Sequence, residues 1–188
     1  MIKAIIFDLV GVLVFKKEGF IPISIEQENA QNIENLFNHI DDEKLLKDIK
    51  EKLKLTNKEI EKATSVIHQK FVKFEKLWET LPSLKKNYKL AVINNGNAIA
   101  LNYWRKKFNF DIFNLFINSA EVKIKKPDKE IFILTCNKLK VKPTQCLFLD
   151  DTLENIESAG KLGMKTILFN KSDGVKELIK LLKKNLIK

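Results

Sequence analysis

Three apolar stretches of this sequence end in side chains that can hold a cation and an anionic group. One stretch ends at Asp8, a second at Asn94 and Asn95, and a third at the pair Asp150 and Asp151. The carboxyl ends of parallel strands share one edge of a sheet, so these side chains are expected to converge on one crevice. Carboxylates at one edge repel each other unless a cation lies among them, and oxygen ligands suit a hard ion such as Mg²⁺.

Lys126 adds a compact positive charge just before a predicted helix and is suited to an anionic substrate. Each residue also has a structural interpretation. Asp8 or Asp151 can cap a turn or helix, Asn94 and Asn95 can form a turn, and Lys126 can be a solvated lysine. Taken together, the acids, the amides and the lysine predict a phosphate site with a divalent metal.

The elements that must position these residues alternate between strand and helix. Strands are predicted over 4–8, 89–94, 112–117, 145–149 and 164–169. Helices are predicted over 98–107 and 126–140, from the residues after Asp151 to 161, and from 174 to the end. This alternation predicts an α/β fold with a doubly wound parallel sheet.

A helical block separates the first strand from the others. A connector is expected over 15–22, and apolar residues recur at three- and four-residue steps from about Ser24 to Thr80, which predicts three helices and no strand. Thr56 and Glu59 have the spacing of a capping box. This connection is far longer than an ordinary βα loop, so we expect an α/β core over 1–14 and 82–188 and a small helical cap subdomain over 15–81.

Four motifs in this order resemble those of the haloacid dehalogenase (HAD) superfamily, in its branch with a small helical cap after the first strand. They are Phe7-Asp8-Leu9-Val10-Gly11-Val12-Leu13, Val92-Ile93-Asn94-Asn95-Gly96, Lys126-Pro127-Asp128, and Asp150-Asp151 followed by Asn155, Ala159 and Gly163. The resemblance implies a Rossmann-like core and a covalent ester on Asp8, which in a phosphatase is an aspartyl-phosphate.

The same resemblance implies a ligand set and a role for each site residue. Mg²⁺ is expected at Asp8, the main-chain carbonyl of Val10 and Asp150, with Asp151 bound directly or through water. Lys126 is expected to neutralise the nucleophile and the transferring group. The Asn94 side chain, with Asn95 beside it, is expected to bind a phosphoryl oxygen.

Two positions depart from the family pattern. Val10 stands where phosphatases of the family carry a second aspartate that protonates the leaving group and activates water. Such acid–base help is typically worth ~10²–10⁴-fold, so slow turnover of ordinary phosphate monoesters is expected. Asn94 replaces serine or threonine, which keeps a donor and changes its reach.

Three functions therefore stay open. The first is a Mg²⁺-dependent phosphatase that acts slowly on a small phosphorylated metabolite. The second is a catalytically impaired binding protein of the same fold. The third is a haloacid dehalogenase-type C–halogen hydrolase. The third fits Val10, because a halide needs no proton to leave, but the predicted cap contains no arginine for the halide.

The composition limits the classes of partner that the protein is expected to bind. The net charge is +10, yet of the 34 basic residues only Arg105 is arginine, and the lysines are interspersed with acids, so solvated helix faces are favoured over nucleic-acid binding. No apolar run reaches the ~20 residues of a membrane span, and no leader peptide is recognised. Cys136 and Cys146 lack a CxxC spacing and suggest reduced thiols in the cytoplasm. The sequence does not indicate an oligomeric state.

Overall fold

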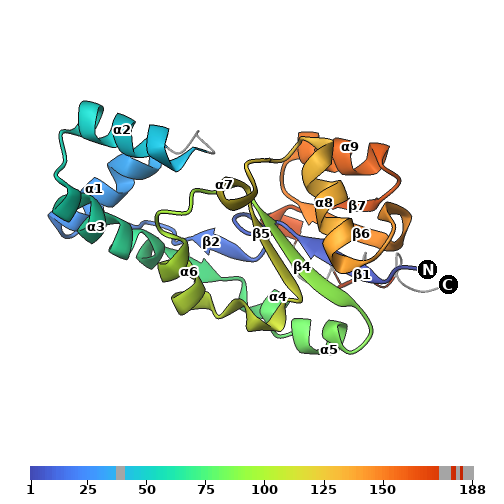
Figure 1. Cartoon of the computed structure of the whole chain (residues 1–188). Helices are drawn as coiled ribbons and strands as arrows, with labels where there is room; N and C mark the ends of the chain where they lie inside the picture. The colour runs from blue at the N-terminus through green and yellow to red at the C-terminus, as the bar shows by residue number, and fades with distance from the viewer. Residues whose placement is uncertain (37–40, 174–178, 181–182, 184–188) are drawn as a thin grey trace.

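The computed structural model describes residues 1–36, 41–173, 179–180 and 183. Its centre is a parallel sheet with the order β5-β4-β1-β6-β7 (Figure 1). The strands are β1 (Ala4–Phe7), β4 (Lys89–Asn94), β5 (Leu115–Asn118), β6 (Cys146–Asp150) and β7 (Lys165–Leu168). The predicted doubly wound α/β fold is confirmed. The helix expected from Gly174 to the end lies almost entirely outside the described residues.

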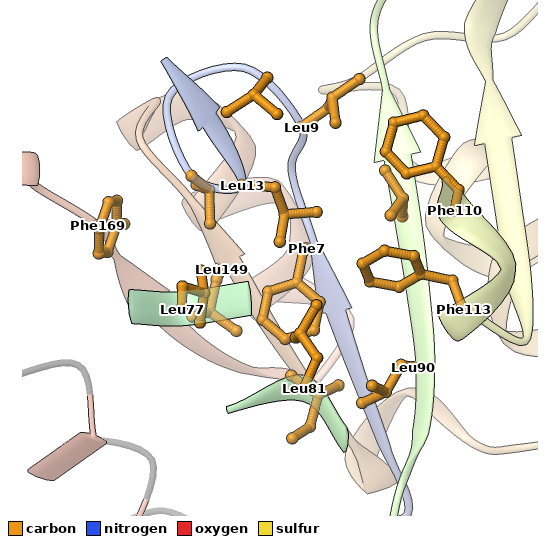
Figure 2. Packing of buried hydrophobic residues seen from close by; sticks show 14 of the residues in the cluster. Phe7, Leu9, Leu13, Leu77, Leu81, Leu90, Phe110, Phe113, Leu149 and Phe169 are labelled. Atoms are coloured by element: carbon orange, nitrogen blue, oxygen red, sulfur yellow. The ribbon is translucent and has the colours of Figure 1, made fainter. Parts of the chain in front are cut away.

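Side chains alternate across the central strand because successive residues of a strand point to opposite faces. Ile6 packs in a cluster with Phe132 of α8 (Lys129–Leu139) and Ala159 of α9 (Leu153–Lys161). Phe7 packs on the other face, in a cluster that includes Leu77 of α4 (Glu75–Trp78) and the other residues shown in Figure 2. Both faces of the sheet are thus buried, as expected for a parallel sheet.

Aromatic rings fill the second face of the sheet. The Phe7 and Phe113 rings meet edge to face at 6.2 Å, and the rings of Phe110 and Phe116 lie 4.7 Å apart. These residues come from β1, from the 3₁₀ turn Phe110–Ile112 and the residue after it, and from β5. The helix α5 (Leu81–Lys85) also packs on this face, and its Leu81 is fully buried in the cluster.

The helices α1 (Ile25–Glu34), α2 (Asp42–Leu53) and α3 (Asn57–Val66) lie beside the sheet (Figure 1) and pack around a second apolar cluster, which also includes Ala100. Each helix has the N-cap that its sequence suggests. Ser24 accepts from the Gln27 amide, Asp41 accepts from two amides, and Thr56 forms a complete capping box. Local sequence therefore sets where these helices begin.

The prediction of no strand between Ser24 and Thr80 is wrong, as is the prediction that residue 15 begins a connector. β2 (Val14–Lys16) and β3 (Phe71–Lys73) form an antiparallel pair in which Phe15 lies opposite Val72. Strands of three residues are too short to interrupt a helical apolar pattern, and this pairing depends on contacts distant in the sequence. The pair carries the chain from β1 toward the helices and back.

Two further elements lie near the carboxyl edge of the sheet. α6 (Leu101–Phe108) follows the loop after β4, and the short α7 (Ser119–Val122) follows β5. Over the residues that the structure describes, no helix combines the length and the apolar character needed to cross a membrane.

Candidate active site

Strand register brings Asp8 and Asp150 together. Phe7 pairs with Leu149, and the Asp8 amide donates to the Leu149 carbonyl at 2.8 Å. Asp8, directly after β1, and Asp150, the last residue of β6, therefore lie at the same level of neighbouring strands. Lys126 reaches them from the turn before α8. Its Nζ donates to Oδ1 of Asp8 and, at 2.7 Å, to Oδ2 of Asp150. The ammonium group is thus held between two carboxylates, one on each strand.

All three of these side chains are buried. The exposed fraction is 7% for Asp8, 3% for Lys126 and 0% for Asp150. Burial raises the pKa of Asp8 to about 6; Lys126 opposes this rise, and the charge of Asp150 adds to it. Burial alone would lower the pKa of Lys126, but the two carboxylates outweigh it and raise that pKa. The lysine therefore stays charged, and Asp8 takes up a proton more readily than an exposed aspartate does.

Asp150 is fixed by bonds to its other oxygen. Oδ1 accepts from the Thr152 amide and from Nδ2 of Asn155, both at 2.9 Å. The Asn155 side chain is buried on α9 and was not predicted as a site residue, although it matches the spacing of the fourth motif. These bonds orient the carboxylate so that Oδ2 faces Lys126.

Asp151 completes an acidic cluster with Asp8 and Asp150. One oxygen from each carboxylate lies within 4.8 Å of the others. The pKa of Asp151 is raised, first by partial burial and then by the charge of Asp150. Carboxylate oxygens that crowd together and disfavour ionisation are the donor set that a hard divalent cation stabilises, so these residues fit Mg²⁺.

Gly11 allows the loop after β1 to approach Asp151. Its φ is +102°, and a Cβ built there would stand 2.0 Å from Oδ2 of Asp151. The Gly11 amide donates to the Val14 carbonyl at 2.9 Å, which curls residues 9–14 into a tight turn. Val10 lies within this turn and is 41% exposed. A role for the Val10 carbonyl as a metal ligand stays a prediction.

Asn94, the last residue of β4, and Asn95, the residue after it, make different contacts. Asn95 bonds the main chain of Lys126 on both sides, accepting from its amide and donating to its carbonyl at 2.8 Å each, just before the cis Lys126–Pro127 bond. Asn94 donates from Nδ2 to Oδ1 of Asn118 at 3.1 Å. Asn95 thus fixes the backbone that carries the lysine, and both asparagines line the cavity beside it.

This cavity has a volume of about 330 Å³ and is lined by Leu9 and Val10, the two residues that follow Asp8; the side chains of the acidic cluster itself do not line it. One wall consists of Leu9 and Val10 and of residues from 94–97 and 100–104, and the other consists of Glu34, Ile67 and Phe71. Sequence reasoning missed Glu34, which is the last residue of α1 and looks from its sequence position like another exposed helix acid. The cavity is small and largely apolar, as sites for small ligands usually are.

A family model described as haloacid dehalogenase-like hydrolase matches residues 2–163. The chain is 32% identical over 95 residues to (S)-2-haloacid dehalogenase 4A of Burkholderia cepacia, an alignment that covers 50% of this chain and 41% of that protein. It is 31% identical over 93 residues to the glyceraldehyde 3-phosphate phosphatase of Methanopyrus kandleri, which covers 47% and 39%. The matched segments thus span about 40% of the length of these curated relatives.

The fold also resembles a solved HAD family enzyme from Bacteroides thetaiotaomicron in complex with magnesium and inorganic phosphate. The TM-score is 0.71, the sequence identity is 24%, and the match covers 89% of this chain and 93% of the other. At this identity the likeness concerns the fold.

Proposed function

The chain belongs to the haloacid dehalogenase-like hydrolase family, and from this premise we propose that it is a Mg²⁺-dependent phosphatase. We propose further that it acts on a small phosphorylated metabolite through an aspartyl-phosphate on Asp8. The observation that carries the proposal is the contact of Lys126 with Asp8 and Asp150 at the edge of the acidic cluster. A buried lysine between acids is the arrangement expected where a further anion and a metal ion are bound together.

In the proposed reaction, an Asp8 oxygen attacks phosphorus, and the bond from phosphorus to the ester oxygen of the substrate breaks. The leaving alkoxide takes a proton from water, because position 10 offers a valine in place of an acid. Water then attacks phosphorus, inorganic phosphate leaves, and the Asp8 carboxylate is restored.

The other site residues stabilise charge during transfer. Lys126 stays protonated between the carboxylates and counters the charge of the phosphoryl oxygens. Asn94 offers an amide donor to one of these oxygens, and Asn95 holds the Lys126 backbone in register. Mg²⁺, held by Asp8, the Val10 carbonyl, Asp150 and Asp151, would supply Lewis-acid stabilisation of the transferring group.

We propose that residues 15–81 form a cap over the core formed by 1–14 and 82–188, apart from the segment around α4 and Leu81, whose Leu77 and Leu81 pack on the sheet. The cavity walls support this, since Glu34, Ile67 and Phe71 face core residues across the space. Asp42 of α2 also accepts from the Ala98 amide at 3.1 Å, which ties the helices to the loop after β4. The cap would exclude water and select the substrate.

The free thiols of Cys136 and Cys146 support a location of the protein in the cytoplasm, where thiols stay reduced.

A C–halogen hydrolase is the alternative that Val10 and the relative from Burkholderia cepacia favour. Its carboxylate substrate calls for a cation in the cavity. Arg105 instead pairs with Glu121 at 3.2 Å and lies outside the cavity wall. A catalytically impaired binding protein is the remaining candidate, and it rests on Val10 alone.

Hydrolysis of p-nitrophenyl phosphate tests the proposed function, because its leaving group scarcely needs an acid. We expect slow, Mg²⁺-dependent release of p-nitrophenol that EDTA and Asp8→Asn each abolish. Activity that survives Asp8→Asn would contradict the proposed nucleophile. A folded protein that binds Mg²⁺ and shows no turnover would favour the impaired binding protein, and dehalogenation of 2-haloacids would favour the alternative enzyme.

A further inference from the structure

The cavity lined by Leu9 and Val10, the residues that follow Asp8, contains a charged side chain that the proposed reaction does not use. Of the described residues that line it, one, Glu34, carries a charge. Its Oε2 forms an ion pair with Nζ of Lys70, the last residue of the 3₁₀ helix Ile67–Lys70. The Lys70 side chain is 3% exposed and the Glu34 side chain is 29% exposed. The lysine is thus enclosed, while the glutamate reaches the space where a ligand would lie.

Stability alone gives little reason for this pair. Taking two charges out of water carries a desolvation penalty, and well-packed apolar residues in place of a buried ion pair often leave stability unchanged or improved. Nζ of Lys70 lies 5.7 Å from the centre of the Phe71 ring, and burial, followed by the charge of Lys16, lowers the pKa of Lys70 to about 8. A hydrophobic pair would fit such a place, so a role in recognition accounts better for the two charges.

Charge balance selects the kind of group that Glu34 can bind. The Glu34 carboxylate, paired with Lys70 through Oε2, lines the cavity and can act there only as a hydrogen-bond acceptor. A carboxylate of the ligand would meet the negative charge of Glu34, and an ammonium would add a second cation near Lys70. A hydroxyl group donates one hydrogen bond and adds no charge, so it fits both neighbours.

We propose that Glu34, neutralised by Lys70, selects phosphate esters whose organic part is uncharged and carries a hydroxyl group. This inference rests on the proposed function and names its substrate class. The phosphoryl group lies at Asp8, and the organic part extends past Val10 into the cavity, where Leu9, Phe71 and Trp104 contact its carbon atoms and Glu34 accepts from its hydroxyl. Glu34 and Lys70 are specificity residues and take no part in bond breaking.

The test compares glycerol phosphate, which carries free hydroxyl groups, with n-propyl phosphate, which has the same three-carbon chain and no hydroxyl group. A hydrogen bond to a charged group predicts a kcat/KM for glycerol phosphate about 10- to 100-fold higher. Phosphoethanolamine and 3-phosphoglycerate, which carry an ammonium and a carboxylate, are expected to be poor substrates. The variant Glu34→Gln/Lys70→Met removes both charges at similar volume and is expected to reduce the preference to within about threefold.

Glu28→Gln is the matched control, since Glu28 is exposed on the same helix, and it is expected to leave the preference unchanged. Hydrolysis of p-nitrophenyl phosphate with equal rates for the two alkyl phosphates would overturn the inference and leave the proposed function intact. A preference that survives the double variant would also overturn it.

Absence of any hydrolysis would instead contradict the proposed function. Calorimetric binding of the same two esters to the Mg²⁺-loaded protein then decides the inference. Tighter binding of glycerol phosphate that the double variant loses would support it, and equal binding would overturn it. If the double variant does not fold, the comparison of the two esters on the wild-type protein remains decisive.

Discussion

Gly11 and Asp151 approach so closely that a methyl group on Gly11 would stand 2.0 Å from a carboxylate oxygen of Asp151. The loop after β1 and the loop after β6 therefore share a space that has no room for a side chain at position 11. The left-handed φ of +102° excludes most other residues for a second, independent reason.

Gly11→Ala is expected to lower the free energy of unfolding by about 1–3 kcal/mol because of strain at this φ, and to weaken Mg²⁺ binding because Asp151 must move. Thermal unfolding and calorimetric Mg²⁺ titration measure the two effects. Gly160→Ala is the control: Gly160 lies in α9 with open space around it, so alanine there should raise stability by about 0.5–1 kcal/mol. Unchanged Mg²⁺ affinity in Gly11→Ala would mean that Asp151 does not contribute to Mg²⁺ binding.

Val10→Asp is expected to raise turnover of aryl and alkyl phosphates, more strongly for the alkyl esters, whose leaving groups need a proton. General acid–base catalysis sets an upper bound of ~10²–10⁴-fold. Val10 is 41% exposed and lines the cavity, so an acid can be placed at this position without full burial. Val10→Asn is the control, because asparagine has nearly the shape of aspartate but cannot act as an acid or a base. Equal rates in Val10→Asp and Val10→Asn, with both variants folded, would mean that the missing acid does not limit the reaction.

Mg²⁺ affinity is expected to fall as the pH falls through about 6. The ion binds the ionised form of Asp8, and burial raises the pKa of that carboxyl to about 6, so protons compete below this pH. The dissociation constant should then rise by up to about tenfold for each further pH unit. Calorimetry from pH 8 to pH 5 measures it. Asp8→Asn should bind more weakly and with a shallower pH dependence; the same steep dependence in this variant would exclude Asp8 as the responsible group.

Lys126→Met is expected to destabilise the metal-free protein by roughly 3–5 kcal/mol at pH 8, because two buried carboxylates lose their shared cation. The loss should shrink toward pH 5, where Asp8 takes up a proton, and added Mg²⁺ should restore part of it. Urea unfolding at both pH values measures this. Lys129→Met, on the exposed first residue of α8, should stay within about 0.5 kcal/mol of wild type. Equal losses at pH 8 and pH 5 would contradict the assigned charges.

Much of the sheet and of the acidic cluster could be predicted from the sequence, because both depend on local pattern. Apolar runs that end in Asp8 and Asp150 define strands, and a parallel sheet brings the ends of neighbouring strands together. The capping box at Thr56 is equally local. These features need no knowledge of which helix packs where.

Contacts between distant segments could not be predicted in this way. The pairing of Phe15 with Val72 was missed because three-residue strands carry too little pattern of their own. The ion pair of Glu34 with Lys70 was missed because each residue, taken alone, looks like one of many charges on a solvated helix. The two hydrogen bonds by which Asn95, directly after β4, holds the main chain of Lys126 also depend on the folded chain.

The central claim is that Asp8 is the nucleophile, and the most direct measurement is mass spectrometry of the Asp8 peptide after an acid quench during turnover of p-nitrophenyl phosphate. Because position 10 lacks an acid–base group to activate water, breakdown of the aspartyl-phosphate should be slow and the intermediate should accumulate. The account predicts a peptide heavier by one phosphoryl group, localised to Asp8 and absent without Mg²⁺. Turnover with an unmodified Asp8 peptide, or with the phosphoryl group on another residue, would contradict it.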